Sequence, residues 1–177
     1  MLHNIIFFQL GWFACVLGAA NHYAWLGVLA SICLLAWHLV ASKNWISEGG
    51  LIILTMLIGF LFDFALMSLG WISFAPLKFW PAQLPPPWMI LLWALFATTL
   101  NFSLNWLKTR SLIAIILGAI SGPLAYWGGS KLGALKLIEP SGAMIYLSLG
   151  WAIVVPALLK IASSIDLYTN LHERRGS

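Results

Sequence analysis

Residues 51–71 decide the fold of this chain and read LIILTMLIGFLFDFALMSLGW. Only one side chain in this stretch, that of Asp63, is ionisable. A helix that crosses the hydrocarbon layer of a membrane needs about 20 mostly apolar residues. The stretch therefore predicts a membrane-spanning helix that carries one acidic residue inside it.

The composition of the whole chain agrees with that prediction. The chain has 177 residues, of which 62% are hydrophobic and 8% are charged. An ordinary soluble domain has about 25% charged residues. So few charged side chains cannot cover a core of this size in water. The composition excludes a water-soluble globule and predicts an all-α integral membrane protein.

Six apolar runs are long enough, or nearly so, to cross the hydrocarbon layer. They predict a single transmembrane domain over residues 1–165 with a bundle of six transmembrane helices. Residues 166–177 are interpreted as a cytoplasmic tail, either amphipathic or disordered. The predicted spans are 2–20, 23–41, 51–71, 88–107, 112–128 and 142–161.

Basic residues and tryptophans indicate how these spans sit in the membrane. Six spans put both termini on one side, and that side collects six of the nine Lys and Arg residues. The positive-inside rule then predicts cytoplasmic N- and C-termini. Most of the 11 tryptophans fall near predicted helix ends and are interpreted as interfacial anchors. Residues 74–81 are aromatic but too short to cross, so they predict an interfacial outer segment, or a lid over an outer site.

A first polar group is predicted in the outer half of the membrane. An intramembrane carboxylate is costly and normally faces the interior of the bundle. Asp63 would share a ligand pocket with Ser121, Tyr126 and Trp151, and Lys131 could act as its counter-ion. The alternative is that Asp63 is structural and only bonds neighbouring helices.

A second polar group is predicted nearer the cytoplasm. Residues 94, 98, 101 and 105 are small or polar and follow one face of the predicted span 88–107. Such a stripe should face protein or water, although interhelical amide bonds can serve helix packing alone. The predicted inner pocket is lined by Gln9, His38, Glu48, Asn101 and Asn105.

The remaining motifs do not add up to a catalytic, metal or cofactor site. The four histidines show no metal-ligand spacing, and no serine lies in a nucleophile-elbow sequence. Cys15 and Cys33 each lie in an apolar run and are interpreted as packing residues. The basic residues form no patch with aromatics, which argues against nucleic-acid binding. We therefore predict no catalytic residue, metal or cofactor, and catalysis is the less favoured interpretation.

Several of these residues resemble the pattern of one family. The similarity rests on Asn4, Gln9 and Trp12, on Asp63 with Gly70, and on residues 92–97, 104–107 and 122–123. The chain resembles a family of small bacterial inner-membrane proteins catalogued as a domain of unknown function. The resemblance implies a multi-pass protein of the bacterial inner membrane. Because members are encoded near lipid-modifying enzymes, it also favours a role linked to lipids.

Three hypotheses of function follow from the sequence. The first is a multi-pass protein that binds or moves a small amphipathic or lipid-like ligand between its helices. The second is a non-catalytic partner subunit that docks on another membrane protein. The docking surface would be a pair of small residues four positions apart, either Ala14 and Gly18 or Gly118 and Gly122. The third is a membrane-embedded lipid-modifying enzyme that uses His38 and Glu48. The expected partners are membrane lipids, a small amphipathic ligand or a membrane protein.

Overall fold

A computed structural model describes the backbone of residues 2–176 and the side chains of residues 2–165. The regular structure of the described residues consists of six α-helices, two short strands and a 3₁₀ helix, η1 (Asn105–Leu107). The strands are β1 (Ile72–Phe74) and β2 (Leu135–Leu137). The six α-helices are α1 (Leu2–Ala20), α2 (Ala24–Ala41), α3 (Trp45–Ser68), α4 (Pro87–Leu100), α5 (Ser111–Leu132) and α6 (Pro140–Gly176).

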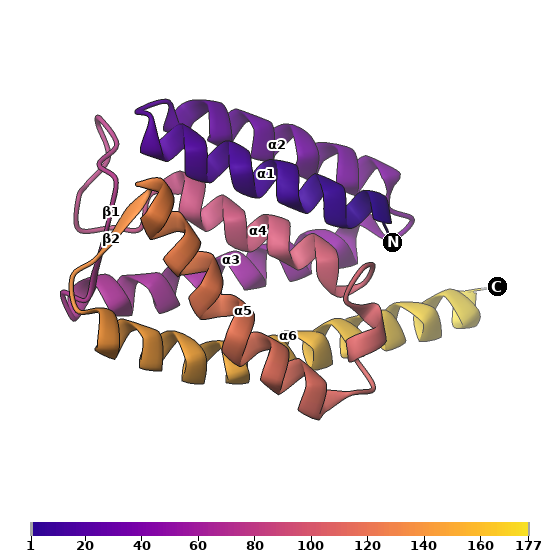
Figure 1. Cartoon of the computed structure of the whole chain (residues 1–177). Coiled ribbons are helices and arrows are strands. Elements are labelled where there is room, and N and C mark those ends of the chain that lie inside the picture. The colour runs from indigo at the N-terminus through magenta and orange to yellow at the C-terminus, as the bar shows by residue number, and fades with distance from the viewer. Residues whose placement is uncertain (1, 177) are drawn as a thin grey trace.

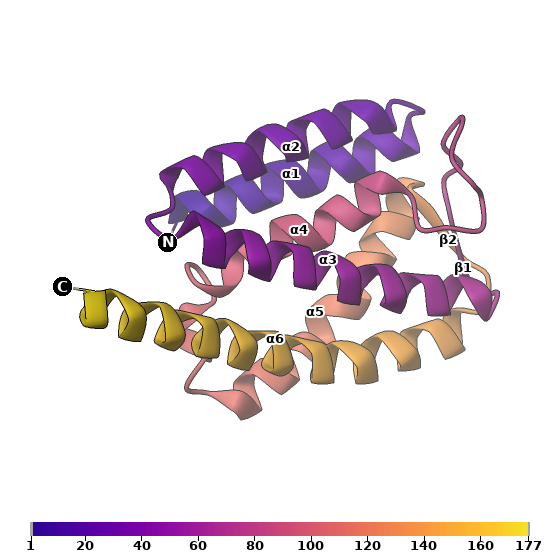
Figure 2. The same cartoon turned by 180° about the vertical axis from the view of Figure 1, so that it is seen from behind.

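Successive helices run in alternating directions, so α1 begins and α6 ends at the same end of the bundle (Figure 1). The hairpin of α1 and α2 forms one side of the molecule, and α5 and α6 form the other (Figure 2). The helices α3 and α4 lie between these two pairs in both views. This order brings residues from the start and the end of the chain against α4.

The helix α4 forms the centre of the core. Ten of its 14 residues are buried, which is the behaviour expected of a helix that is apolar on all sides. Large side chains on the other helices, such as Leu29, Ile53 and Ile153, are instead more than half exposed on the outside of the bundle. An apolar outer surface of this kind suits contact with lipid rather than water.

Five helices, α1, α2, α3, α5 and the Pro140–Ile165 part of α6, are long and apolar enough to cross a membrane. Their length and composition support the prediction that the chain is a membrane protein. The helix α4 has 14 residues, about 21 Å at 1.5 Å per residue, against a hydrocarbon layer of about 30 Å. The fourth of the six predicted spans is therefore shorter than the sequence indicated.

The prediction of one continuous helix over residues 88–107 is wrong. The helix ends at Leu100 and is followed by turns and by η1. Polar side chains here offer the backbone other hydrogen bonds, which compete with a helix. Asn4 Nδ2 donates to the carbonyl oxygen of Thr98 at 3.0 Å, and Ser103 Oγ donates to Asn4 Oδ1 at 2.7 Å. These bonds tie the chain after α4 to the start of α1.

Other boundaries differ from the predicted ones by a few residues or more. The helix α3 begins at Trp45, so Glu48 lies inside it rather than before it. The helix α6 continues as far as Gly176, beyond the predicted end of the sixth span. Side chains of residues 166–177 lie outside the described ones, so an amphipathic tail stays a prediction.

A small two-stranded sheet closes the end of the bundle opposite the beginning of α1 (Figure 1). β1 and β2 pair antiparallel, with Ser73 opposite Lys136. The sheet joins the connection after α3 to the one between α5 and α6. Phe74, the first residue of the predicted interfacial segment 74–81, is therefore the last residue of β1, while the position of 74–81 relative to a membrane stays a prediction.

Candidate functional site

Asp63 lies at the centre of the bundle with no exposed surface. The indole Nε1 of Trp93 donates a hydrogen bond to its Oδ2 at 2.9 Å, and the hydroxyl of Tyr126 donates to its Oδ1. Three helices, α3, α4 and α5, therefore meet at one carboxyl group. A Cβ at Gly59, one turn before Asp63, would overlap the ring of Trp93, so this glycine is needed for the approach of α4 to α3.

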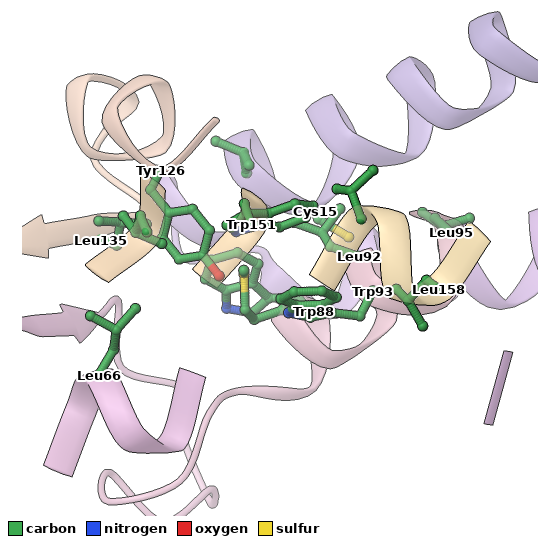
Figure 3. Close-up of a cluster of buried hydrophobic side chains, with 14 of the residues drawn as sticks. Cys15, Leu66, Trp88, Leu92, Trp93, Leu95, Tyr126, Leu135, Trp151 and Leu158 are labelled. Carbon is green, nitrogen blue, oxygen red and sulfur yellow. The ribbon is translucent and has the colours of Figure 1, made fainter. Parts of the chain in front are cut away.

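A second aromatic contact joins α4 to α6. The rings of Trp93 and Trp151 are stacked, with centroids 4.7 Å apart and planes at 16° (Figure 3). Side chains at Gly118 and Gly122 of α5 would overlap the backbone and the ring of Trp151, respectively. These two glycines therefore serve helix packing inside the chain.

Beside this aromatic cluster lies a cavity of about 620 Å³. Its walls come from α1, α4, α5, α6 and the segments that follow α4 and α5, and they are mostly apolar. None of the lining residues is charged. They include Phe8, Gln9, Trp12, Trp88, Trp93, Phe96, Ser103, Ser121, Leu124, Ala125, Tyr126 and Trp151.

The structure brings three of the residues predicted for the outer pocket, Ser121, Tyr126 and Trp151, to the wall of this cavity. Asp63 is not part of the wall but lies behind it, bonded to Tyr126 and Trp93. The ammonium of Lys131 lies 5.6 Å from the ring centroid of Trp127. Among the side chains of residues 2–165, none forms an ion pair with Asp63, so Lys131 is not its counter-ion in this structure.

Gln9 and Ser121 of the cavity wall are exposed, and neither side chain has a hydrogen-bond partner among the described residues. Other wall hydroxyls are already used as donors: that of Thr99 donates to the carbonyl of Phe96, and that of Ser103 to Asn4. The indole N–H groups of Trp88 and Trp151 are buried and also find no acceptor within residues 2–165. The cavity wall is therefore mostly apolar but contains several hydrogen-bonding groups without a partner among the described residues.

A separate polar cluster joins the ends of α2, α3 and α4. His38 Nε2 lies 3.0 Å from Glu48 Oε2, and Asn101 Nδ2 donates to Glu48 Oε1 at 2.6 Å. Lys108 Nζ donates to Asn101 Oδ1 at 2.7 Å. His38 and Glu48 are buried, and each carboxyl oxygen of Glu48 has a hydrogen-bond partner.

This cluster corrects the predicted inner pocket. His38, Glu48 and Asn101 meet as expected, but Gln9 lines the large cavity with Ser121 instead. Asn105 lies on η1 and not on a stripe of α4, because the helix ends before it. The expected inner pocket is thus a chain of hydrogen bonds between three of its five members.

Sequence reasoning missed two residues, Trp93 and Lys108. Trp93 is the sixth residue of the predicted span 88–107 and lies in the middle of the observed helix α4, whereas interfacial tryptophans lie at helix ends. The signal that could have found it is an indole N–H donor more than one turn inside an apolar span, which needs an acceptor such as Asp63. Lys108 was counted only as a basic residue that sets orientation.

The comparisons with known proteins give one match. A family model described as "Protein of unknown function (DUF2878)" matches residues 1–157. No curated protein and no solved structure matches the chain. The function therefore has to be inferred from the cavity and from the cluster of His38, Glu48 and Asn101.

Proposed function

The chain belongs to the DUF2878 family of proteins of unknown function, and we propose that it binds a small amphipathic or lipid-like ligand between its membrane helices. The observation that carries this proposal is the cavity of about 620 Å³. Sites for small molecules have volumes of about 300–1,000 Å³ and mostly apolar walls with a few polar groups. The cavity has this size and this lining.

The position of the cavity supports entry of the ligand from the membrane. Phe8 and Trp12 on α1 and Leu124 and Ala125 on α5 belong to its wall. The helix α1 packs mainly on α2 and α4 and has little contact with α5. A ligand dissolved in the bilayer would enter between α1 and α5 without first crossing into water. We place the protein in the bacterial inner membrane with cytoplasmic termini, as the basic residues predict.

A role as a partner subunit is less well supported. The small residues expected to dock on another protein are used inside the chain, since Gly118 and Gly122 pack on Trp151. In α1, Ala14 lies against Gly27, and Gly18 lies against the backbone of Tyr23. Neither stripe of small residues is left to contact a second protein.

A lipid-modifying enzyme is a second candidate because His38 and Glu48 are in direct hydrogen-bond contact. A histidine oriented by a carboxylate is a common general base. Neither residue lines the cavity, however, so the reacting group of a ligand held there would not meet them. Binding without chemistry therefore stays the first proposal.

Filling the cavity tests the proposed binding. Ala125→Phe places a ring in the wall, and Ala36→Phe, on an exposed part of α2, adds the same ring outside it. Both variants and the unmodified protein would be purified from native membranes, and bound lipid would be identified by native mass spectrometry. We expect Ala125→Phe to retain at least about tenfold less ligand, because the ring and the ligand need the same space.

Two results would contradict the proposal. One is equal retention by Ala125→Phe and Ala36→Phe. The other is an unmodified protein that retains no lipid or other small molecule. Thermal unfolding of each variant in the same detergent shows whether the added ring has disturbed the fold.

A further inference from the structure

We propose that the polar part of the ligand is uncharged and is bound by Gln9 and Ser121 near the middle of the membrane. The inference rests on the proposed function and names its ligand class: a lipid whose polar group is an ester, a ketone or a hydroxyl. It is carried by three observations: the absence of charged residues in the wall, the two side chains without a partner, and their distance from the ends of α1 and α5.

No charged residue lines the cavity, whose lining residues all belong to the described part of the chain. An ionised group buried there would have no counter-ion, and an unpaired buried charge is strongly unfavourable. A phosphate, carboxylate or ammonium group therefore does not suit this cavity. Uncharged polar groups suit it, because hydrogen bonds alone can satisfy them.

Gln9 and Ser121 supply such hydrogen bonds. The amide of Gln9 offers two donors and one acceptor oxygen, and the hydroxyl of Ser121 can donate or accept. Both side chains are exposed and line the cavity, and neither has a hydrogen-bond partner among residues 2–165. Within a membrane such polar groups are costly when unpaired. Helical serines often satisfy themselves by donating to the carbonyl four residues earlier, as Ser163 does toward Leu159. Ser121 makes no such bond, so its hydroxyl is available to a ligand.

Both side chains lie far from the ends of their helices. Gln9 is the eighth residue of the 19 in α1, and Ser121 is the eleventh of the 22 in α5. At 1.5 Å per residue, they lie roughly 10 and 15 Å from the starts of these helices. A charged headgroup would have to leave the interfacial zone to reach them, whereas an uncharged group can move to this depth at much lower cost.

The choice of probes separates charge from chain length. Methyl oleate and oleyl alcohol have uncharged polar groups, and oleate at pH 8 has the same chain with a carboxylate. Binding of each to the delipidated full-length protein would be measured by native mass spectrometry in one detergent. We expect both uncharged probes to bind at least about tenfold more tightly than oleate.

Variants of the two side chains test where the polar group binds. Gln9→Leu and Ser121→Ala should each weaken binding of oleyl alcohol about fivefold, the effect of one neutral hydrogen bond. Ser148→Ala, which removes a hydroxyl of α6 outside the cavity, should leave binding unchanged. An unchanged thermal unfolding temperature shows that a weaker-binding variant is still folded.

Several results would overturn this inference: oleate that binds as tightly as the uncharged probes, no binding of either uncharged probe, or full affinity in Gln9→Leu and Ser121→Ala. If Ala125→Phe still removes the native ligand in these cases, the proposed function stands and only the ligand class is wrong. If Ala125→Phe also has no effect, the proposed function fails as well.

Discussion

Asp63 shows how a single residue can organise three helices. Its carboxyl accepts from Trp93 and Tyr126, and both of these side chains also line the cavity. Asp63 does not line the cavity itself. It would affect a bound ligand only by fixing the positions of the Trp93 and Tyr126 rings. This arrangement combines the two interpretations of the sequence, because the same bonds hold helices together and shape the cavity.

Replacing Asp63 by alanine should destabilise the protein. Two buried donors, on Trp93 and Tyr126, would lose their acceptor, and each such loss costs about 1–3 kcal/mol. Thermal unfolding in detergent should show Asp63→Ala well below the unmodified protein, with Asp63→Asn in between because its amide oxygen still accepts one bond. An Asp63→Ala protein that is as stable as the unmodified one but retains no lipid would instead assign Asp63 directly to the ligand.

At the scale of the elements, the close pair α5 and α6 depends on small residues. A Cβ at Gly118 would overlap the carbonyl oxygen of Trp151, an atom of the backbone that cannot turn away. A Cβ at Gly49 in α3 would meet no atom within 4 Å. Where no atom is in the way, alanine stabilises a helix by about 1 kcal/mol relative to glycine.

These two glycines therefore make a matched pair of tests. We expect Gly118→Ala to lower the thermal unfolding temperature, because α6 must shift away from α5 and strain of this kind costs about 1–3 kcal/mol. Gly49→Ala should leave it unchanged or raise it slightly. Equal unfolding temperatures for the two variants would show that α5 and α6 do not pack as described.

The segment between α4 and α5 is held by the cluster of His38, Glu48 and Asn101. Because Glu48 binds the other two side chains, Glu48→Ala should release this segment from α2 and α3. Trypsin should then cleave faster after Lys108 or Arg110 than in the unmodified protein. Glu139→Ala, at the other end of the bundle, is the control, and equal cleavage in both variants would contradict a role of Glu48 in holding the segment.

At the scale of the whole molecule, alternating helices put the α2–α3 and α4–α5 connections at one end and the α3–α4 and α5–α6 connections at the other (Figure 1). The first two connections contain Lys43, Lys108 and Arg110, and the other two contain Lys78 and Lys136. A green fluorescent protein fused to the C-terminus should fluoresce, because we expect that end to be cytoplasmic. Alkaline phosphatase inserted after Lys78 should be active, and the same enzyme inserted after Lys108 should be inactive. Active phosphatase after Lys108 would show that α4, with its 14 residues, does not cross.

The class of the protein was predictable from its sequence because composition alone decides it. Long apolar runs predicted α1, α2, α3, α5 and α6, because only helices and closed β-barrels satisfy the backbone in lipid and runs of about 20 apolar residues suit helices. The predicted ends agree within a few residues, except that α3 begins six residues earlier and α6 ends 15 residues later. The end of α4 was not predictable in this way. Whether polar side chains interrupt a helix depends on partners such as Asn4, which lies far away in the chain.

Composition and the apolar runs alone indicated a helical membrane protein that carries one acid, Asp63, inside an apolar span. Only the tertiary structure decided which polar groups meet: Asp63 with Trp93, and Gln9 with Ser121 in one cavity rather than with His38. The physical reason is that lipid and protein core are both apolar. A helix in a membrane therefore has no hydrophobic stripe to reveal its inner face, and its rotation is set by packing against its neighbours.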